Sequence, residues 1–270
     1  DRAVRLTQQL QAAQIPVVEL PLLELVAQPY SAELDSLYKQ LNRAQVIVVV
    51  SPTAVQIGMQ YLAQAGIELA TLAHIQWIAV GRSTEQALLQ YGIQSHVPEV
   101  ETSEGMLQLP ILESLEKDAV VAFWRGEGGR LFMMDHLRQQ GVEVLNFVLY
   151  QRQCPVQSQQ TIAALLPRLQ DNRHYMVLMS SEASWLNWVQ LMQQDISLIS
   201  KGIYLVLGPR LAAILGEYRQ HHAAAFEYVQ LESLSSDVIV REMKRVLGTH
   251  EENFNRAVHC GVYLDGKNQL

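Results

Sequence analysis

The chain is poor in cysteine and has no long hydrophobic run. Two cysteines, Cys154 and Cys260, occur in 270 residues, which excludes a disulfide framework and a CxxC metal pair. No stretch reaches the roughly 18 consecutive apolar residues expected of a membrane-spanning helix. Residues 1–14 form a polar amphipathic pattern that is unlike a signal peptide. These absences favour a cytoplasmic protein that does not contact a membrane.

Positive charge is also scarce. The 20 lysine and arginine residues are outnumbered by 27 aspartate and glutamate residues, which gives a net charge of −7 and argues against a nucleic acid partner. An anionic ligand would therefore need local hydrogen-bond donors. The 8 histidines include no pair at a metal-ligand spacing such as HExxH, so we predict no metal site.

What the chain does contain is an alternation of β-rich runs with amphipathic helical patterns. Hydrophobic residues make up 49% of the chain, and runs such as residues 46–50 are continuously apolar, as in parallel strands covered on both faces. The pattern predicts an α/β fold with parallel sheets. We expect strands at residues 16–25, 44–51, 75–81, 95–100, 119–125, 143–152, 174–181, 202–208 and 226–233. We expect helices at residues 1–14, 32–43, 52–66, 83–92, 103–116, 129–141, 157–170, 182–194, 209–220 and 235–248.

Three strand–turn–helix units of the first half recur in the same order in the second half. The pairs are residues 46–62 and 175–192, 75–93 and 202–220, and 102–116 and 234–248. Any two α/β domains share such units, but the matched order and spacing favour a duplication. We therefore predict two similar α/β domains, each with a parallel sheet flanked by helices.

Two proline-flanked strands are expected to cross between these domains as a two-stranded β connector, because proline suits edge or isolated strands. We predict connector strands within residues 16–29 and 145–154. One domain would then be discontinuous in sequence. Because the chain starts with an expected helix where the fold type requires a strand first, we also expect a strand before residue 1. The predicted domains are residues 1–22 with 155–248, and residues 30–147, followed by a C-terminal appendage at residues 249–270.

The segment RGEGGR at residues 125–130 follows an expected strand and precedes an expected helix. It fails as a dinucleotide fingerprint because Leu131 stands where the third glycine belongs, and it lacks the Gly-Lys-Ser/Thr ending of a Walker A loop. Its glycines suit a tight turn. The flanking arginines favour a carboxylate or phosphate site at Arg125, Gly126 and Gly128.

Other turns also place possible donors at strand ends. Ser51 and Ser180 can cap the helices that follow them, and serines at the carboxyl ends of parallel strands can also bind a ligand. Thr84 offers a hydroxyl in the next turn, where it could equally cap a helix. Tyr150 ends an expected connector strand, where an ordinary strand tyrosine is the alternative to a functional one.

In their order along the chain, these segments resemble the uroporphyrinogen-III synthase family over roughly residues 1–248. The matching segments are SPTAV, AVGRSTEQAL, SEGML, RGEGGRLFMMDHLRQQGVEVLNFVLYQR, SSEAS and GPRLAAIL. The resemblance implies two α/β domains joined by two strands, with the active site in the cleft. It also implies a lyase of tetrapyrrole (heme) biosynthesis that cyclises linear hydroxymethylbilane to uroporphyrinogen III. The reaction loses water and inverts ring D, and it needs no metal and no organic cofactor.

The resemblance also implies roles for individual residues. Tyr150 matches the cleft tyrosine of the family and would donate a proton, directly or through water. Leu211 and Ala212 depart from the family, because many relatives carry serine or threonine there. The resemblance favours a monomer that makes at most transient contacts with neighbouring pathway enzymes. The residues expected to bind substrate are Ser51, Thr84, Arg125, Gly126, Gly128, Ser180, Ser181 and Gly208.

A second hypothesis is a non-catalytic, two-lobed protein that binds an anionic small molecule. Such proteins also have two α/β lobes and crossing strands, whereas the start of the chain is unlike the signal peptide of a secreted binding protein.

Overall fold

The structure is a computed structural model that describes residues 2–128, 131–171 and 174–249. Residues 250–270 of the predicted appendage, which include Cys260, and Arg130 lie outside the described residues. The chain divides into two compact units. Unit 1 is described over residues 2–24, 153–171 and 174–249, and unit 2 over residues 25–128 and 131–152. No helix in the described part of the chain is long and apolar enough to span a membrane.

Unit 2 contains a five-stranded sheet in the order β1-β5-β4-β2-β3. Strand β2 pairs in parallel with both β3 and β4, and β4 pairs in parallel with β5. Parallel strands place their carboxyl ends at one edge of the sheet, which is where open α/β sheets bind ligands. The strands are β1 (Glu24–Ala27), β2 (Val46–Val49), β3 (Gln76–Ala79), β4 (Val120–Gly126) and β5 (Glu143–Gln153).

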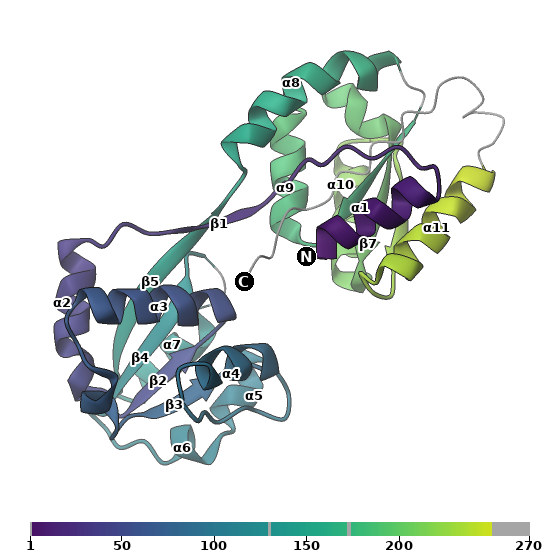
Figure 1. The fold of residues 1–270 in the computed structure, drawn as a ribbon. Coiled ribbons are helices and arrows are strands. Elements are labelled where there is room, and N and C mark those ends of the chain that lie inside the picture. The colour runs from purple at the N-terminus through teal and green to yellow at the C-terminus, as the bar shows by residue number, and fades with distance from the viewer. Residues whose placement is uncertain (1, 129–130, 172–173, 250–270) are drawn as a thin grey trace. The chain divides into compact units, whose positions relative to one another are not determined.

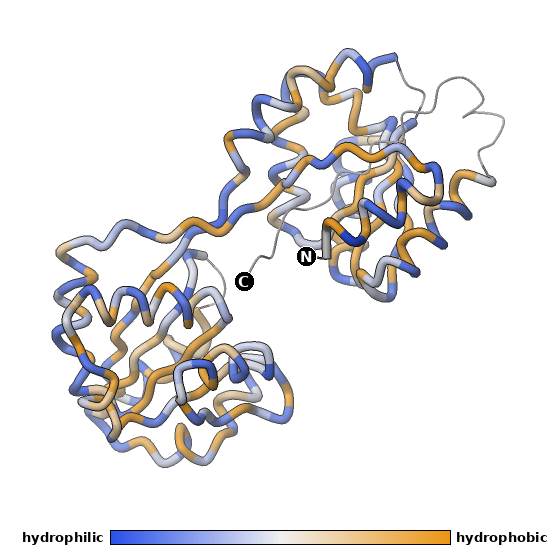
Figure 2. Tube along the Cα trace, in the orientation of Figure 1, coloured by the Kyte–Doolittle hydropathy of each residue, from blue (hydrophilic) through white to orange (hydrophobic). Residues whose placement is uncertain are grey.

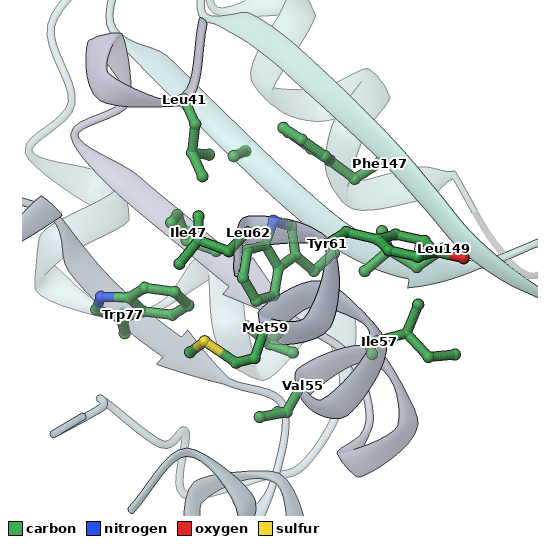
Figure 3. Packing of buried hydrophobic residues seen from close by; sticks show 14 of the residues in the cluster. Leu41, Ile47, Val55, Ile57, Met59, Tyr61, Leu62, Trp77, Phe147 and Leu149 are labelled. Carbon is green, nitrogen blue, oxygen red and sulfur yellow. The ribbon is translucent and has the colours of Figure 1, made fainter. Parts of the chain in front are cut away.

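Helices cover both faces of this sheet because its strands are apolar on both faces. In β2, Ile47 and Val49 join the core cluster under α2, α3 and α4, whereas Val46 and Val48 join the cluster under α5, α6 and α7. Figure 3 shows part of the first cluster, with Ile47 beside Leu62 of α3. The helices are α2 (Ala32–Gln40), α3 (Pro52–Gln64), α4 (Arg82–Leu89), α5 (Ser103–Leu107), α6 (Pro110–Glu113) and α7 (Phe132–Gln139), with 3₁₀ turns η1 (Leu41–Arg43) and η2 (Leu69–Leu72).

Unit 1 has a three-stranded parallel sheet in the order β6-β7-β8. Its strands alternate in the same way, since Tyr175 and Val177 face the core formed with α8, α9 and α10, while Met176 and Leu178 face α1 and α11. Hydrophobic residues are concentrated along the strands in Figure 2, and Figure 1 labels most of the elements. The elements of unit 1 are α1 (Arg2–Ala12), α8 (Val156–Asp171), β6 (Tyr175–Met179), α9 (Glu182–Leu191), η3 (Ile196–Lys201), β7 (Gly202–Leu207), α10 (Gly208–His221), β8 (Glu227–Leu231) and α11 (Ser236–Thr249).

These sheets confirm the predicted α/β class with parallel strands flanked by helices. The crossing segments differ from the expectation in extent. Residues 16–23, all of which are described, form no strand, and β1 begins only at Glu24. Pro21 lacks an N–H for a ladder, and its carbonyl instead accepts a hydrogen bond from Ser158 Oγ at 2.6 Å. Strands β1 and β5 are neighbours in the sheet of unit 2, and each contains one boundary between the units.

Two further expectations were wrong because of proline. The strand expected at residues 95–100 is reduced to an isolated bridge between His96 and Ile78, and Pro98 follows at once. The helix expected at residues 103–116 is divided into α5 and α6, with Pro110 as the first residue of α6. Proline has no N–H and favours the first position of a helix, so it ends one helix and begins the next.

Gly58 allows α3 to pack closely against Trp124. A Cβ on Gly58 would lie 2.2 Å from Cε3 and 2.4 Å from Cζ3 of the Trp124 indole, which is fully buried. Helix propensity alone favours Gly58→Ala by about 1 kcal/mol, but overpacking a filled core costs typically about 1–3 kcal/mol. We expect Gly58→Ala to lower the free energy of unfolding of unit 2 in urea titrations.

The matched control is Gly248→Ala, since Gly248 is also helical and a Cβ there would meet no atom within 4 Å. That variant is expected to be at least as stable as the parent protein. A Gly58→Ala protein as stable as the parent would contradict the packing argument.

Each unit contains a buried tyrosine whose phenol is expected to make stability depend on alkaline pH. Burial raises the pKa of Tyr38 in unit 2 and of Tyr204 in unit 1 above the ordinary 10.0. The folded protein therefore keeps a proton above pH 10 that the unfolded chain releases, so this stability is present below pH 10 and is lost above it. We expect the free energy of unfolding to fall by about 1.4 kcal/mol per pH unit and per tyrosine above pH 10. In urea titrations at pH 9 to 11, Tyr38→Phe should show a smaller loss, and an equal loss would contradict this assignment.

Candidate active site

The end of β4 and the adjacent part of β5 form the centre of the candidate site in unit 2. Gly126 pairs with Tyr150 at a register shift, and the next amide, that of Glu127, donates to the Tyr150 carbonyl at 2.6 Å. A Cβ on Gly126 would lie 2.4 Å from Cε2 and 2.5 Å from Cζ of the Tyr150 ring. Glycine at position 126 therefore leaves room for the ring to lie against the strand end.

Tyr150 is paired with Ser51 across the sheet. Its Oη lies 3.0 Å from Ser51 Oγ, although the two residues are 99 positions apart in sequence. They meet because β2, β4 and β5 are adjacent parallel strands whose carboxyl ends share one edge. Tyr150 is 1% exposed, whereas Ser51 is half-buried.

Ser51 is also the N-cap of α3, as predicted. Its Oγ accepts a hydrogen bond from the Ala54 amide at 3.1 Å, and Pro52 occupies the first turn of the helix. The capping bond uses one lone pair of the hydroxyl and leaves its proton available for another acceptor.

Two arginines hold the glycine-rich loop beside Tyr150. Arg125 is 8% exposed, and its guanidinium donates to the Gly128 carbonyl. Arg152 donates to the Glu127 carbonyl at 3.1 Å, and its Cζ lies 5.5 Å from the centroid of the Tyr150 ring. Burial lowers the pKa of Arg125, Tyr150 partly opposes this effect, and the neighbouring charge of Arg152 adds to it. The arginines therefore hold the loop, and Arg152 places positive charge near the Tyr150 ring.

Gly128 meets a different requirement from that of Gly126. Its φ of +73° lies in the left-handed region, and a Cβ there would meet no atom within 4 Å. Glycine is favoured at position 128 for its backbone conformation, whereas at position 126 it is favoured for space.

Thr84 lies in the first turn of α4, and Glu101, which sequence reasoning missed, contacts the start of this helix. Thr84 is 1% exposed, and its Oγ1 has no hydrogen-bond partner among the described residues. The first amide of α4, that of Arg82, donates to a Glu101 carboxylate oxygen at 3.0 Å. A carboxylate of the chain itself therefore already binds the start of this helix, and a role for Thr84 in binding substrate stays a prediction.

The candidate turns of unit 1 also lie at the carboxyl ends of parallel strands. Ser181, and not the predicted Ser180, caps α9, because β6 ends at Met179 and the helix begins only at Glu182. Ser181 Oγ accepts from the Ser184 amide at 3.2 Å and lies 2.6 Å from Ser184 Oγ.

Gly208 begins α10 with a φ of +72°. Leu211 and Ala212, where the sequence departs from many relatives, are buried in the unit 1 core. The substrate-binding roles predicted for Ser180, Ser181 and Gly208 stay predictions.

The structure thus brings together Ser51, Arg125, Gly126, Gly128 and Tyr150 in unit 2. Sequence reasoning missed Arg152, although a signal for it existed. Residues two apart on a strand lie on the same face, so an arginine two positions after Tyr150 is placed to contact its ring. No group of three or more histidine, cysteine, aspartate or glutamate side chains that could hold a metal occurs in the described part of the chain.

Comparisons with known proteins agree on one family. The model of the family described as uroporphyrinogen-III synthase HemD matches residues 4–235. The uroporphyrinogen-III synthase of Proteus mirabilis is 30% identical over 150 residues, which cover 55% of this chain and 74% of that protein. A mutant uroporphyrinogen III synthase of the extremely thermophilic bacterium Thermus thermophilus is similar in fold, with a TM-score of 0.60, 16% identity and coverage of 91% of this chain and 94% of that one.

The uroporphyrinogen-III synthetase of Helicobacter pylori has a TM-score of 0.54 at 14% identity and covers 83% of this chain and 90% of that one. At these identities the two solved structures show a shared fold. The family match spans most of the sequence and includes every residue of the candidate site. The chain belongs to the uroporphyrinogen-III synthase family.

Proposed function

We propose that the chain catalyses the reaction for which its family is named. It converts linear hydroxymethylbilane into uroporphyrinogen III with loss of water and inversion of ring D, as a cyclising hydro-lyase. The observation that carries this proposal is the hydroxyl pair of Tyr150 and Ser51, 3.0 Å apart, at the carboxyl edge of a parallel sheet in a chain that matches the family over residues 4–235.

The pair suits the first chemical step. The pyrrole nitrogen of the substrate drives departure of the terminal hydroxyl, so the step needs a positioned proton donor. Tyr150 is held for this task by Gly126 beneath its ring, by the Ser51 hydroxyl and by Arg152.

The substrate also carries many carboxylates, which backbone amides, hydroxyl groups and arginines bind well. We assign this binding to Ser51, Thr84, Arg125, Gly126 and Gly128 in unit 2, where buried Arg125 holds the loop and adds charge rather than extending into solvent. The corresponding turns of unit 1 are assigned the same task at Ser180, Ser181 and Gly208.

The proposal is tested by supplying the purified chain with enzymatically generated hydroxymethylbilane and separating the products. Formation of the type III isomer is expected. If only the uninverted type I isomer of spontaneous closure appears, the proposed activity is wrong. The rival hypothesis of a non-catalytic binding protein predicts this second result, and the matched family and similar structures give it no support.

A further inference from the structure

The buried position of Tyr150 raises the question of how its proton reaches the substrate. Tyr150 is 1% exposed, and its Oη lies against Ser51 Oγ at 3.0 Å. Ser51 is half-buried and is therefore the more accessible of the two hydroxyl groups. A group so enclosed is poorly placed to touch the departing hydroxyl of a bulky substrate.

The hydrogen-bond capacity of Ser51 suggests the answer. A serine hydroxyl has one proton to donate and two lone pairs that accept. One lone pair accepts from the Ala54 amide at 3.1 Å. If the second accepts from the Tyr150 phenol, the proton of Ser51 is left to point toward a ligand.

We propose that Ser51 is the catalytic residue that hands a proton to the leaving hydroxyl, and that Tyr150 acts behind it and restores the proton of Ser51. This inference rests on the proposed function. It assigns the single proton of Ser51 to the chemical step rather than to binding a carboxylate, while Ser51 still caps α3.

The protons balance over the reaction. The Ser51 proton moves to the substrate hydroxyl as the carbon–oxygen bond breaks, and water leaves. The Tyr150 proton moves to Ser51 Oγ, so that the phenol becomes a phenolate while the bilane becomes a pyrrole-stabilised cation. To invert ring D, the cation bonds to the ring D carbon that already carries a bridge, that older bridge bond breaks, and a new carbon–carbon bond forms at the unsubstituted carbon of ring D. That carbon then loses its proton, which returns through Ser51 to the phenolate. The sum is the loss of one water, and no oxidant or reductant takes part.

Two cationic side chains lie near the Tyr150 ring. A buried anion is costly unless it is paired, and here two cations are close. The Arg152 guanidinium carbon lies 5.5 Å from the ring centroid, and the buried Arg125 directly precedes Gly126, whose backbone lies against the ring. Both arginines are held in place by carbonyls of the glycine-rich loop.

Tyr38 provides an internal contrast. It is also fully buried in unit 2, but its phenol donates to the backbone carbonyl of Gly58 at 2.9 Å. A carbonyl carries no proton that it can pass on, so Tyr38 cannot serve as such a relay.

The test compares kcat for type III formation in the single variants Ser51→Ala and Tyr150→Phe and in the double variant. A relay works only when both hydroxyl groups are present, so each single variant is expected to lose about tenfold to a thousandfold. The double variant is expected to lose no more than the worse single variant. A double variant whose loss equals the product of the two single losses would show independent roles and overturn the relay.

Because Ser51 caps α3, two further variants separate the cap from the chemistry. Ser51→Asn keeps a good N-cap without a hydroxyl and is expected to be as impaired as Ser51→Ala, whereas Ser51→Thr keeps both and is expected to retain most of the activity. Full activity in Ser51→Asn would overturn the proposal. The controls are Ser31→Ala, which removes another serine cap from unit 2, and Tyr38→Phe. Both are expected to leave kcat unchanged, and a comparable loss in either would overturn the proposal.

The relay and the proposed function fail in different ways. If the parent protein forms no type III isomer, the proposed function itself is wrong. If the parent protein forms it and Ser51→Asn does so at the same rate, only the relay is wrong.

Discussion

Tyr150→Phe is expected to lower kcat for formation of the type III isomer by about tenfold to a thousandfold, the range that general acid catalysis typically supplies. Phenylalanine keeps the ring against Gly126 and removes only the hydroxyl that lies 3.0 Å from Ser51. The fold should therefore persist. The measurement is the initial rate of type III formation at saturating substrate, with circular dichroism and a urea titration on the same sample.

The matched control is Tyr38→Phe, which removes another buried phenol from unit 2 outside the site. It is expected to retain its kcat. Unchanged turnover in Tyr150→Phe would remove Tyr150 from the chemistry. A loss of turnover that follows only the loss of folded protein would make its role structural.

Gly126→Ala is expected to reduce kcat at least as much as Tyr150→Phe and also to lower stability. A Cβ at position 126 would lie 2.4 Å from Cε2 of the Tyr150 ring, so the ring must move and its bond to Ser51 is lost. Overpacking of this kind costs typically about 1–3 kcal/mol. The measurements are kcat for the type III isomer and the free energy of unfolding from urea titrations.

Gly128→Ala is the comparison for stability, because a Cβ at position 128 would meet no atom within 4 Å and only its positive φ is strained. Its cost in stability should lie near the low end of the range for such backbone strain, about 1 kcal/mol. A Gly126→Ala protein with full activity would show that the position of the Tyr150 ring does not matter.

Much of the fold could be predicted from local pattern, because local pattern reports burial. The continuous apolar run at residues 46–49 is typical of a strand covered on both faces, and it forms β2. The serine and proline at positions 51 and 52 indicated the start of α3, since the chemistry of a cap is local. The predictions at Pro98 and Pro110 were wrong because the hydrophobic periodicity was extended across these prolines, which interrupt a strand and a helix.

The arrangement of the site could be predicted only in part. The contact of Tyr150 with Ser51 spans 99 positions and depends on the strand order β5-β4-β2, which hydrophobic periodicity does not encode. The burial of Thr84 and the carboxylate of Glu101 at the start of α4 depend on tertiary packing in the same way. Sequence placed Arg125 at the loop but did not show that its guanidinium holds Gly128.

The most direct test of the proposed function is the fraction of type III isomer formed from one preparation of hydroxymethylbilane at increasing concentrations of the chain. Spontaneous closure to the type I isomer has a rate constant that does not depend on the protein. The rate of an enzyme-catalysed closure rises in proportion to protein concentration. The proposed function predicts that the type III fraction rises with protein concentration and approaches the whole product. A product that stays type I at every concentration would contradict it.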